Sequence, residues 1–498
     1  MAEWFAYRDP RLTPVLEEPE WEPKYPVLIT DEEDTHPSAD SPASDEMLLR
    51  AVLEDVRAVA GERAQAVTAH TNIVELGLDS LERLEIVNRV ESRFGGIFPE
   101  SVLLSMETCA EVAEATKKYL VGPRLALAPP AEVPSENYRL DALPEYTRLR
   151  QTRDAMGLGE MESPYFRTYA GATRDTTSWN GQEFVSFSGY NYLGMSGHPQ
   201  VSQAAKHAIL RHGTSASASR LVSGQRDVHH ELEQELASFL GTEDALVLVG
   251  GHATNVTTIG HLLGPGDLIL HDSLAHNSIV QGALLSGSQR RPFPHNDWQA
   301  LERMLAHLRG GFRRVLIAIE GVYSMDGDYP DLREFTRLKH TYRTYLLVDE
   351  AHSLGTMGPT GRGIGEHFGT PPSDVDIWMG TLSKALGSCG GYIAGSLALI
   401  DYMKHTAPGF VYSVGMAPPL AAAALAALRL LRKSSDAVGR CRARSRLFLE
   451  LARKEGLPTG SSEGTPVIPV IVGSSRIALE LSQRLLVHGI IVHPIMYP

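Results

Sequence analysis

The second half of the chain alternates between short apolar runs and longer amphipathic stretches, and this alternation limits the possible folds severely. Five apolar runs lie at 245–249, 268–270, 315–319, 345–348 and 377–379. Helical periodicity lies between or after them, at 228–240, 332–341 and 420–431. A strand that is apolar on both faces must be covered on both. The pattern therefore predicts an α/β domain, at 146–437, whose mainly parallel sheet lies between helix layers.

The pattern changes after residue 437 and predicts a small α+β subdomain at 438–498. We expect a helix, a strand at 467–472, a second helix and a last apolar run at 490–493.

Charge separates the beginning of the chain from the rest. Residues 1–120 hold 25 acidic and 11 basic residues, which accounts for the whole formal net charge of −14. Within this part, 1–44 is rich in Pro, Glu, Asp and Ser and predicts an acidic disordered tail. Helical periodicity at 45–121 predicts a small helical bundle. Five prolines at 122–145 predict a semi-extended linker to the larger domain.

Composition argues against several classes of function. Nucleic acids and anionic membranes select for Lys/Arg patches, which the acidic first part does not supply. Cys109, Cys389 and Cys441 are scattered and lack any CxxC or His pairing, so we expect no disulfide framework and no metal site. The chain does not begin like a secretory signal, and its longest apolar stretch, 418–428, is too short to span a bilayer. We therefore expect a cytoplasmic protein.

The first chemical signal is Ser80, where Leu-Gly-Leu-Asp-Ser-Leu leads into an amphipathic helix. Read alone, Asp79 or Ser80 is a suitable helix cap. The segment 47–120 also resembles acyl and peptidyl carrier proteins, whose Asp-Ser-Leu motif carries 4′-phosphopantetheine on its serine. The resemblance implies that Ser80 carries this arm. It also implies two partners, a phosphopantetheinyl transferase and an upstream acyl-loading enzyme.

The second signal combines an aspartate with a lysine. Asp349 ends a buried-type strand, at the sheet edge where open α/β folds place their chemistry, and Lys384 lies among small residues. Read alone, Lys384 is a surface lysine, and 349–352 matches the metal-binding strand of a helicase. The helicase reading requires a phosphate loop upstream, which the sequence lacks. Together the two residues suit pyridoxal phosphate, which needs a lysine for its Schiff base and an acid at its ring nitrogen.

Five motifs in order resemble the α-oxoamine synthases, which are fold-type I pyridoxal phosphate enzymes with a large, mainly parallel seven-stranded sheet. They lie at 189–194, 213–220, 320–328, 348–355 and 381–387. The similarity runs from about residue 165 to the end of the chain. The resemblance implies a homodimer with shared active sites.

This resemblance implies roles around the cofactor ring. Lys384 would bind the cofactor covalently, and Asp349 would face the ring nitrogen. His276 would stack on the ring, although an ordinary turn histidine is the alternative. Ser324 and His352 would bind the ring hydroxyl.

Further residues are implied for the phosphate and the substrate. Thr381, Gly251 and His252 would hold the phosphate, and the turn at 250–251 has the two glycines that a phosphate cradle needs. Ser413 would reach the phosphate from the neighbouring subunit, and Asn191 would lie near the substrate. For Ser413 and Asn191, an ordinary polar turn residue remains the alternative.

The chain departs from the family at its end. The family continues beyond the run at 490–493 with further strands and a helix, including an arginine that binds the amino-acid carboxylate. We therefore expect the subdomain to be truncated, leaving an unpaired sheet edge, or another group to bind the carboxylate. His229 and His230 are read as exposed positions at the start of a helix.

The two signals together predict one reaction. An amino acid would lose its Cα proton to Lys384, attack an acyl thioester on the Ser80 arm, and lose CO₂ to give an α-amino ketone. Asp349 would stabilise the carbanion through the cofactor, and His352 would polarise the oxyanion. Two alternatives are another fold-type I enzyme, an aminotransferase or decarboxylase with an accessory carrier domain, and a non-catalytic carrier and docking protein.

Overall fold

The computed structural model describes residues 45–64, 66–73, 76, 80–94, 98, 108–120, 133–155 and 163–495. They fall into two compact units that divide after Gln151. The predicted tail at 1–44 lies outside the described residues. No helix in the described ranges is both long and apolar enough to cross a membrane.

The first unit is a small helical bundle, as predicted. Its helices are α2 (Asp45–Ala60), α3 (Ser80–Phe94) and α5 (Cys109–Tyr119). Apolar residues at helical spacing form its core, among them Val52, Val56, Ile86, Val90 and Val112. The start of α5 is fixed by a capping box, in which Thr108 and Glu111 each accept a hydrogen bond from the other's backbone N–H.

The predicted linker is partly folded. From residue 133 it contains two 3₁₀ turns, Ser135–Asn137 and Leu140–Ala142, and then helix α6 (Pro144–Ala155). The prediction of semi-extended chain is therefore wrong for 133–145, and residues 121–132 lie outside the described ranges. Pro134 precedes one turn and Pro144 opens α6, positions where the fixed φ of proline favours a helical start.

The second unit contains a seven-stranded sheet in the order β3-β9-β8-β7-β6-β4-β5. All neighbours pair in parallel except β9, which runs antiparallel between β3 and β8. The strands are β3 (Asp244–Leu248), β4 (Leu268–Asp272), β5 (Gln289–Phe293), β6 (Val315–Glu320), β7 (Tyr345–Asp349), β8 (Ile377–Thr381) and β9 (Gly391–Gly395). The mainly parallel sheet is confirmed, and the five predicted runs correspond to β3, β4, β6, β7 and β8.

The sequence analysis did not predict strands β5 and β9. Strand β9 holds a short apolar run, 392–394, between two glycines, and a Cβ on Gly391 would lie 2.8 Å from the Cα of Gly251 at the start of helix α9. Strand β5 is an edge strand, and its two arginines and Pro292 are typical of an edge that avoids further pairing.

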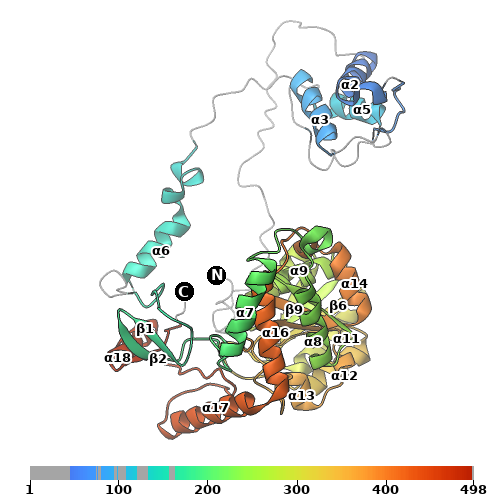
Figure 1. Ribbon diagram of the computed structural model, residues 1–498. Helices are drawn as coiled ribbons and strands as arrows, with labels where there is room; N and C mark the ends of the chain where they lie inside the picture. Colours follow the sequence, from blue (N-terminus) through green and yellow to red (C-terminus); the bar gives the residue numbers. More distant parts are fainter. Residues whose placement is uncertain are drawn as a thin grey trace. The chain divides into compact units, whose positions relative to one another are not determined.

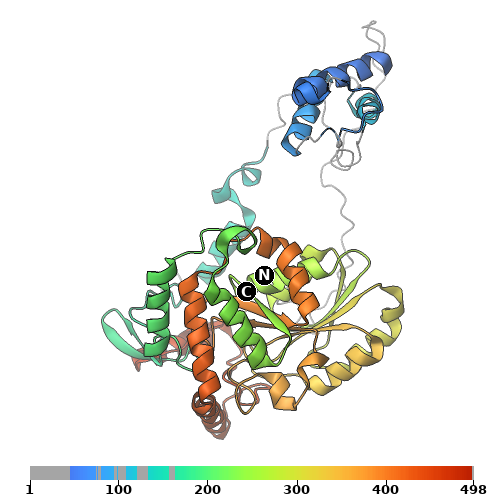
Figure 2. The same ribbon diagram turned by 45° about the vertical axis from the view of Figure 1, so that its right-hand side comes forward.

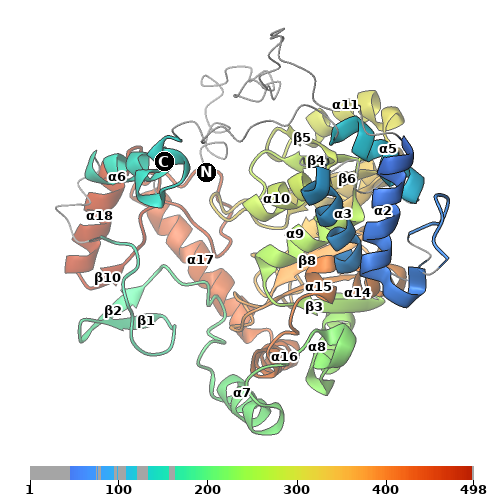
Figure 3. The ribbon, with the colours of Figure 1, turned by 90° about the horizontal axis from the view of Figure 1, so that it is seen from above.

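Both faces of the sheet are covered, because successive strand residues point to opposite sides. Helices α7, α8, α11, α12, α13 and α16 pack with one set of strand residues, and α9, α10, α14 and α15 with the other (Figures 1 and 3). The first group is α7 (Pro199–His212), α8 (Asp227–Leu240), α11 (Trp298–Leu308), α12 (Leu332–Tyr342), α13 (Ile364–Phe368) and α16 (Pro418–Lys433). The second is α9 (Gly251–Leu262), α10 (Asn277–Ser286), α14 (Leu397–Thr406) and α15 (Pro408–Val411). Figure 2 shows strands of the sheet between helices.

The small subdomain differs in part from its prediction. Helices α17 (Asp436–Lys454) and α18 (Ser475–Val487) are present. The sheet has the order β1-β2-β10 and takes β1 (Thr176–Trp179) and β2 (Gln182–Ser186) from far earlier in the chain, with β10 at Ile490–Ile491. The strand predicted at 467–472 is wrong. The carbonyl of Val467 accepts hydrogen bonds from the hydroxyls of Ser462 and Thr465 rather than from a neighbouring strand.

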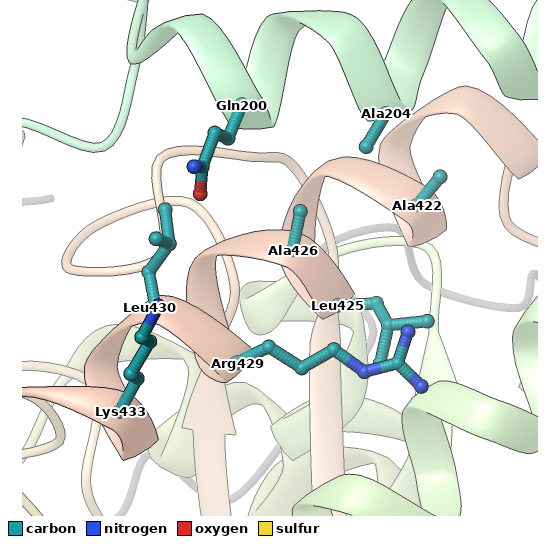
Figure 4. A pocket seen from close by; sticks show the side chains of 8 residues that line it. All are labelled: Gln200, Ala204, Ala422, Leu425, Ala426, Arg429, Leu430 and Lys433. Atoms are coloured by element: carbon teal, nitrogen blue, oxygen red, sulfur yellow. The ribbon is translucent and has the colours of Figure 1, made fainter.

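A surface pocket of about 380 Å³ lies between α7 and α16 (Figure 4). It is lined by Gln200, Ala204, Ala422, Leu425, Ala426, Arg429, Leu430 and Lys433. None of the residues predicted to act in the reaction lines this pocket. Two of them, Asp349 and Thr381, lie instead at the ends of β7 and β8.

Candidate active site

Three polar side chains end neighbouring parallel strands. Glu320 ends β6, Asp349 ends β7 and Thr381 ends β8, and the register places Glu320 directly beside Asp349. The carboxyl ends of parallel strands form one edge of a sheet, where open α/β folds bind their ligands. This edge therefore brings the predicted Asp349 and Thr381 to the same region of the fold.

Asp349 is held by buried hydrogen bonds. It is 4% exposed, and its Oδ1 accepts from the backbone N–H of Ala351 at 2.9 Å. Its Oδ2 accepts from Nδ2 of Asn255 at 2.7 Å, and the same amide donates to the Ser278 hydroxyl at 2.9 Å. Sequence reasoning did not identify Asn255, although it lies four residues after the predicted phosphate turn at 250–251. An asparagine on the buried face of a helix was the available signal.

Lys384 and His352 lie in direct contact. Nζ of Lys384 is 2.7 Å from Nε2 of His352, whose Nδ1 is 2.7 Å from the hydroxyl of Tyr192. The ring of Tyr190 meets His352 edge-on, with ring centroids 6.3 Å apart, and lies 5.7 Å from Nζ of Lys384. Lys384 therefore faces an enclosed cluster, which contradicts the reading of a free surface lysine.

Burial controls the charge of this cluster. It lowers the pKa of Lys384 below the ordinary 10.5, although the carboxylates of Asp349 and Glu320 oppose the effect. Burial, helped by Lys384, lowers the pKa of His352 well below 6.5. Burial, and then Asp349, raises the pKa of Glu320 well above 4.5. At neutral pH, His352 is therefore a neutral imidazole, and protonation of Glu320 is easier than for an ordinary glutamate.

His276 caps helix α10 next to this cluster. Its Nδ1 lies 2.7 Å from the Ser278 hydroxyl, and its backbone N–H donates to Glu320 at 2.6 Å. Its side chain is exposed, but the atoms behind the ring still desolvate it and lower its pKa. The ring of His252 lies 6.1 Å away at 77°. Stacking of His276 on a cofactor ring stays a prediction.

The start of α9 fits a phosphate group. Gly250 caps this helix without a side-chain hydrogen bond, so the first N–H groups of α9 are free of an intrahelical partner. A Cβ on Gly251 would lie 3.0 Å from Oγ1 of Thr381, so only glycine leaves that approach open. Thr381 also contacts the hydroxyl of Ser383 at 2.7 Å, a neighbour that sequence reasoning did not single out. The residues present thus fit a phosphorylated pyridine with an aldehyde, next to a buried acid and a lysine whose pKa is lowered.

The loop that carries Ser324 is fixed by a buried charge cluster. Nδ1 of His295 lies 2.9 Å from Asp272, and its Nε2 lies 3.0 Å from Asp328. Ser461 of the small subdomain donates to the same Asp328 oxygen at 2.7 Å. Burial opposes the charge on His295, but the two carboxylates outweigh it and raise its pKa to about 10. Ser324 is half-buried, and its bond to a cofactor hydroxyl stays a prediction.

This cluster makes stability depend on pH. Because the folded-state pKa of His295, about 10, exceeds its ordinary 6.5, its contribution is complete below pH 6.5 and is lost as the pH rises through 10. We expect the melting temperature to fall more across this window in the wild type than in His295→Gln, which has no charge to lose. Calorimetry at both ends of the window measures the difference, and parallel losses in the two proteins would contradict the assignment.

Asn191 and Ser80 are two further predicted site residues, and Ser80 belongs to the first unit. The amide of Asn191 donates to the carbonyls of Thr173 at 2.8 Å and Ser196 at 3.3 Å, and its oxygen accepts from the N–H of Ser196 at 3.0 Å. The polar-turn alternative accounts for these contacts, and proximity to the substrate stays a prediction. Ser80 is the first residue of α3, and the rest of its motif, 77–79, lies outside the described residues.

Ser413 is half-buried just after α15 and donates to the carbonyl of Val414 at 3.3 Å. Its role in a neighbouring subunit stays a prediction. The prediction that His229 is exposed is wrong, because its side chain is fully buried. Its Nε2 contacts the carbonyl of Met416 at 2.6 Å and so anchors the end of the segment that carries Ser413. The sequence could not indicate this contact because the two residues are far apart in the chain. His230 is exposed, as predicted.

A buried ion pair supports the same segment. Arg220 binds Glu233 through two hydrogen bonds, of 2.6 and 2.9 Å, with both side chains at most 4% exposed. The Arg220 guanidinium also lies over the ring of Phe410, in α15, at 5.3 Å. The pair therefore connects α8 to the segment that carries Ser413.

Removing one partner leaves the other charge buried. We expect Glu233→Ala to lower the free energy of unfolding of this unit by about 3–5 kcal/mol, because the Arg220 guanidinium loses its carboxylate. Denaturant titration measures the loss. The matched control is Glu231→Ala on the same helix, whose exposed pair with Arg429 is expected to contribute less than about 1 kcal/mol. Equal losses in the two variants would contradict the prediction.

Comparison with known proteins supports two different parts of the chain. Residues 182–498 match the family Aminotransferase class I and II, and residues 50–116 match the family Phosphopantetheine attachment site. The 8-amino-7-oxononanoate synthase of Geobacter sulfurreducens is 42% identical over 334 residues, which are 67% of this chain and 85% of that protein. A putative 8-amino-7-oxononanoate synthase of Caulobacter vibrioides is also 42% identical, over 69% of this chain and 86% of its own length.

Solved structures are similar over the same part of the chain. Serine palmitoyltransferase of Sphingomonas wittichii superposes with a TM-score of 0.67 at 30% identity, covering 70% of this chain and 88% of that one. Serine palmitoyltransferase of S. paucimobilis, solved with pyridoxal phosphate and myriocin bound, has a TM-score of 0.67 at 27% identity, covering 70% of this chain and 90% of its own.

Proposed function

The chain belongs to the pyridoxal phosphate-dependent α-oxoamine synthases of the class I and II aminotransferase family and carries a phosphopantetheine attachment domain, and from this we propose its reaction. It condenses an amino acid with an acyl thioester held on the phosphopantetheine of its own carrier domain. The C–S bond of the thioester breaks, and the products are an α-amino ketone, CO₂ and the free thiol of the phosphopantetheine arm. The observation that carries the proposal is the contact of Lys384 with His352 at the sheet edge where Asp349 lies, in a chain that also has an attachment domain.

The residues around Lys384 suit the cofactor. Pyridoxal phosphate, when bound, supplies an electron sink for negative charge at the amino-acid Cα. Lys384 would bind it covalently, with Asp349 at its ring nitrogen. Its phosphate would be bound by Thr381 and by the start of α9, at Gly251 and His252. Its ring would be contacted by His276, Ser324 and His352, with Ser413 added by a second subunit.

The side chains of the chain itself move and hold protons. Lys384 has a lowered pKa, so it can act as a neutral base for the Cα proton once it is free of the cofactor. His352 is neutral and can donate a hydrogen bond to the oxygen that becomes negative when the thioester is attacked. Glu320 accepts a hydrogen bond from the backbone N–H of His276, and its raised pKa reduces the negative charge beside Asp349. Tethering the thioester to the chain replaces a bimolecular encounter by an effective concentration of about millimolar.

Several finer features belong to the same proposal. They are a homodimer with shared active sites, a phosphopantetheinyl transferase and an upstream acyl-loading enzyme as partners, a cytoplasmic location, and the domain limits 45–121, 146–437 and 438–498. The alternatives are an aminotransferase or decarboxylase with an accessory carrier domain, or a non-catalytic carrier. Both predict that no acyl group is transferred to the amino acid.

The deciding experiment loads the carrier arm with a panel of acyl groups and supplies glycine, alanine or serine. We expect CO₂ release together with an α-amino ketone of matching mass for at least one pair. CO₂ without a joined product would favour the decarboxylase alternative, and exchange of the amino group would favour the aminotransferase. Absence of any turnover across the panel would favour the non-catalytic carrier.

A further inference from the structure

Tyr192 contacts the reactive lysine through one intermediate side chain. It lies in the loop at 189–194, which tertiary folding brings to His352, 160 residues away in the chain. The contacts form a row, with 2.7 Å from the Tyr192 hydroxyl to Nδ1 of His352 and 2.7 Å from Nε2 to Nζ of Lys384. A neutral imidazole has one nitrogen that carries a proton and one that does not. The hydrogen bond at one ring nitrogen therefore determines whether the other nitrogen carries the proton.

The direction of the first hydrogen bond follows from the Tyr192 hydroxyl. Burial, with smaller effects of Tyr190 and Cys441, raises the pKa of this hydroxyl, so it keeps its single proton. Within the described ranges, His352 is its one hydrogen-bond partner in the protein. If the hydroxyl accepted a proton from Nδ1, its own hydrogen would face no protein acceptor, at a cost of about 1–3 kcal/mol. Donation from Tyr192 to Nδ1 satisfies both groups.

The second hydrogen bond then has a fixed direction as well. With Nδ1 accepting, the proton of neutral His352 is on Nε2, which faces Lys384. An N–H at 2.7 Å needs an acceptor, and a lysine offers one only as an uncharged amine. The carboxyl groups of Asp349 and Glu320 act against this state, while burial of the amine favours it and gives the net lowering of its pKa.

We propose that Tyr192 is a positioning residue that holds His352 in its Nε2–H form and thereby keeps Lys384 as a neutral amine. This inference rests on the proposed function and deepens it, because an uncharged amine is what both cofactor binding and proton removal require. The same form leaves His352 with a hydrogen-bond donor directed into the site. A charged Lys384 would instead need a bare Nε2, which the Tyr192 contact disfavours.

The test titrates Lys384 in the full-length chain freed of cofactor. Competitive acetylation across pH, read by mass spectrometry of the Lys384 peptide, gives the pKa of this amine without any turnover. In Tyr192→Phe, His352 can move its proton to Nδ1 and accept from a charged lysine. We expect the pKa of Lys384 to rise by about one unit, which is about tenfold less modification at a fixed pH below it.

The matched control is Tyr190→Phe. Its ring also meets His352 edge-on, but its hydroxyl has no hydrogen-bond partner among the described residues, so no change in the pKa of Lys384 is expected. In a His352→Asn background, adding Tyr192→Phe is expected to have no further effect, because the intermediate is gone. A shift of equal size in that background, or in the control, would overturn the proposal.

A second substitution keeps the test decisive if Tyr192→Phe does not fold. Difluorotyrosine at position 192 preserves the shape and is a stronger proton donor, so it is expected to lower the pKa of Lys384 further. A second readout is the absorbance band that appears when pyridoxal phosphate is added back at different pH values. The pH at which this band appears is expected to shift in the same direction as the pKa of Lys384. An unchanged pKa with difluorotyrosine refutes the role of Tyr192. It leaves the proposed reaction standing, because no acyl substrate enters the measurement.

Discussion

Replacing Lys384 by alanine is expected to abolish both the visible absorbance of bound cofactor and CO₂ release from the loaded carrier. Two functions disappear together, because the same amine that would bind the cofactor also lies where a Cα proton can be taken. General acid–base catalysis alone contributes about 10²–10⁴-fold, so we expect turnover to fall by at least about 10³-fold. Absorption spectra after addition of pyridoxal phosphate, and product mass from the loaded chain, measure the two losses separately.

Lys433→Ala is a suitable control for this variant. Lys433 is exposed on α16 and lines the pocket of Figure 4, away from the residues that surround Lys384. Its loss is expected to change neither the spectrum nor the turnover. If Lys384→Ala kept the band and most of the turnover, another amine would be the reactive one, and the assignment of the site would be wrong.

Replacing Ser80 by alanine is expected to remove the acyl group from the reaction while leaving the catalytic unit intact. A phosphopantetheinyl transferase should add one arm to the wild-type chain and none to the variant, as read by intact mass. Turnover from carrier-bound acyl groups should disappear. Addition of a free acyl thioester at about the effective concentration of the tether, near millimolar, is expected to restore part of it.

The control lies on the same helix. Ser92→Ala replaces an exposed serine of α3 and is expected to keep both the mass shift and the turnover. An adduct that survives in Ser80→Ala would place the arm on another residue. Turnover that is lost in Ser80→Ala and not restored by any free thioester would indicate that the carrier contributes more than delivery.

Much of the fold could be predicted because its strands are buried on both faces. Continuous apolar runs indicate such strands directly, and β3, β4, β6, β7 and β8 were found in this way. Strand β9 was missed because its short apolar run, 392–394, directly follows the glycine-rich segment 387–391, where close packing of α9 requires glycine at 391. The strand predicted at 467–472 failed for the opposite reason. Its residues suit a strand, but the described chain has no neighbouring strand paired with it, and a strand exists only through pairing.

Candidate site residues could be predicted where they lie in local motifs. Lys384, Asp349 and the Ser80 segment are candidates because each sits in a short pattern that one chemical task requires, and their roles stay predictions. The contacts of Asn255 and Tyr192 were missed, and His229 was placed wrongly. In each case the deciding partner is distant in the chain, as the carbonyl of Met416 is for His229.

The sequence by itself determined the helical carrier bundle and the parallel sheet, and it predicts roles for the lysine, the aspartate and the serine. These depend on local periodicity and on residue type. Only the tertiary structure decided the electrostatics at the sheet edge. The pKa values of Lys384, His352 and Glu320 depend on burial and on neighbours contributed by other strands and loops. Desolvation arises only when the chain has folded, so no local pattern could state in which direction each pKa moves.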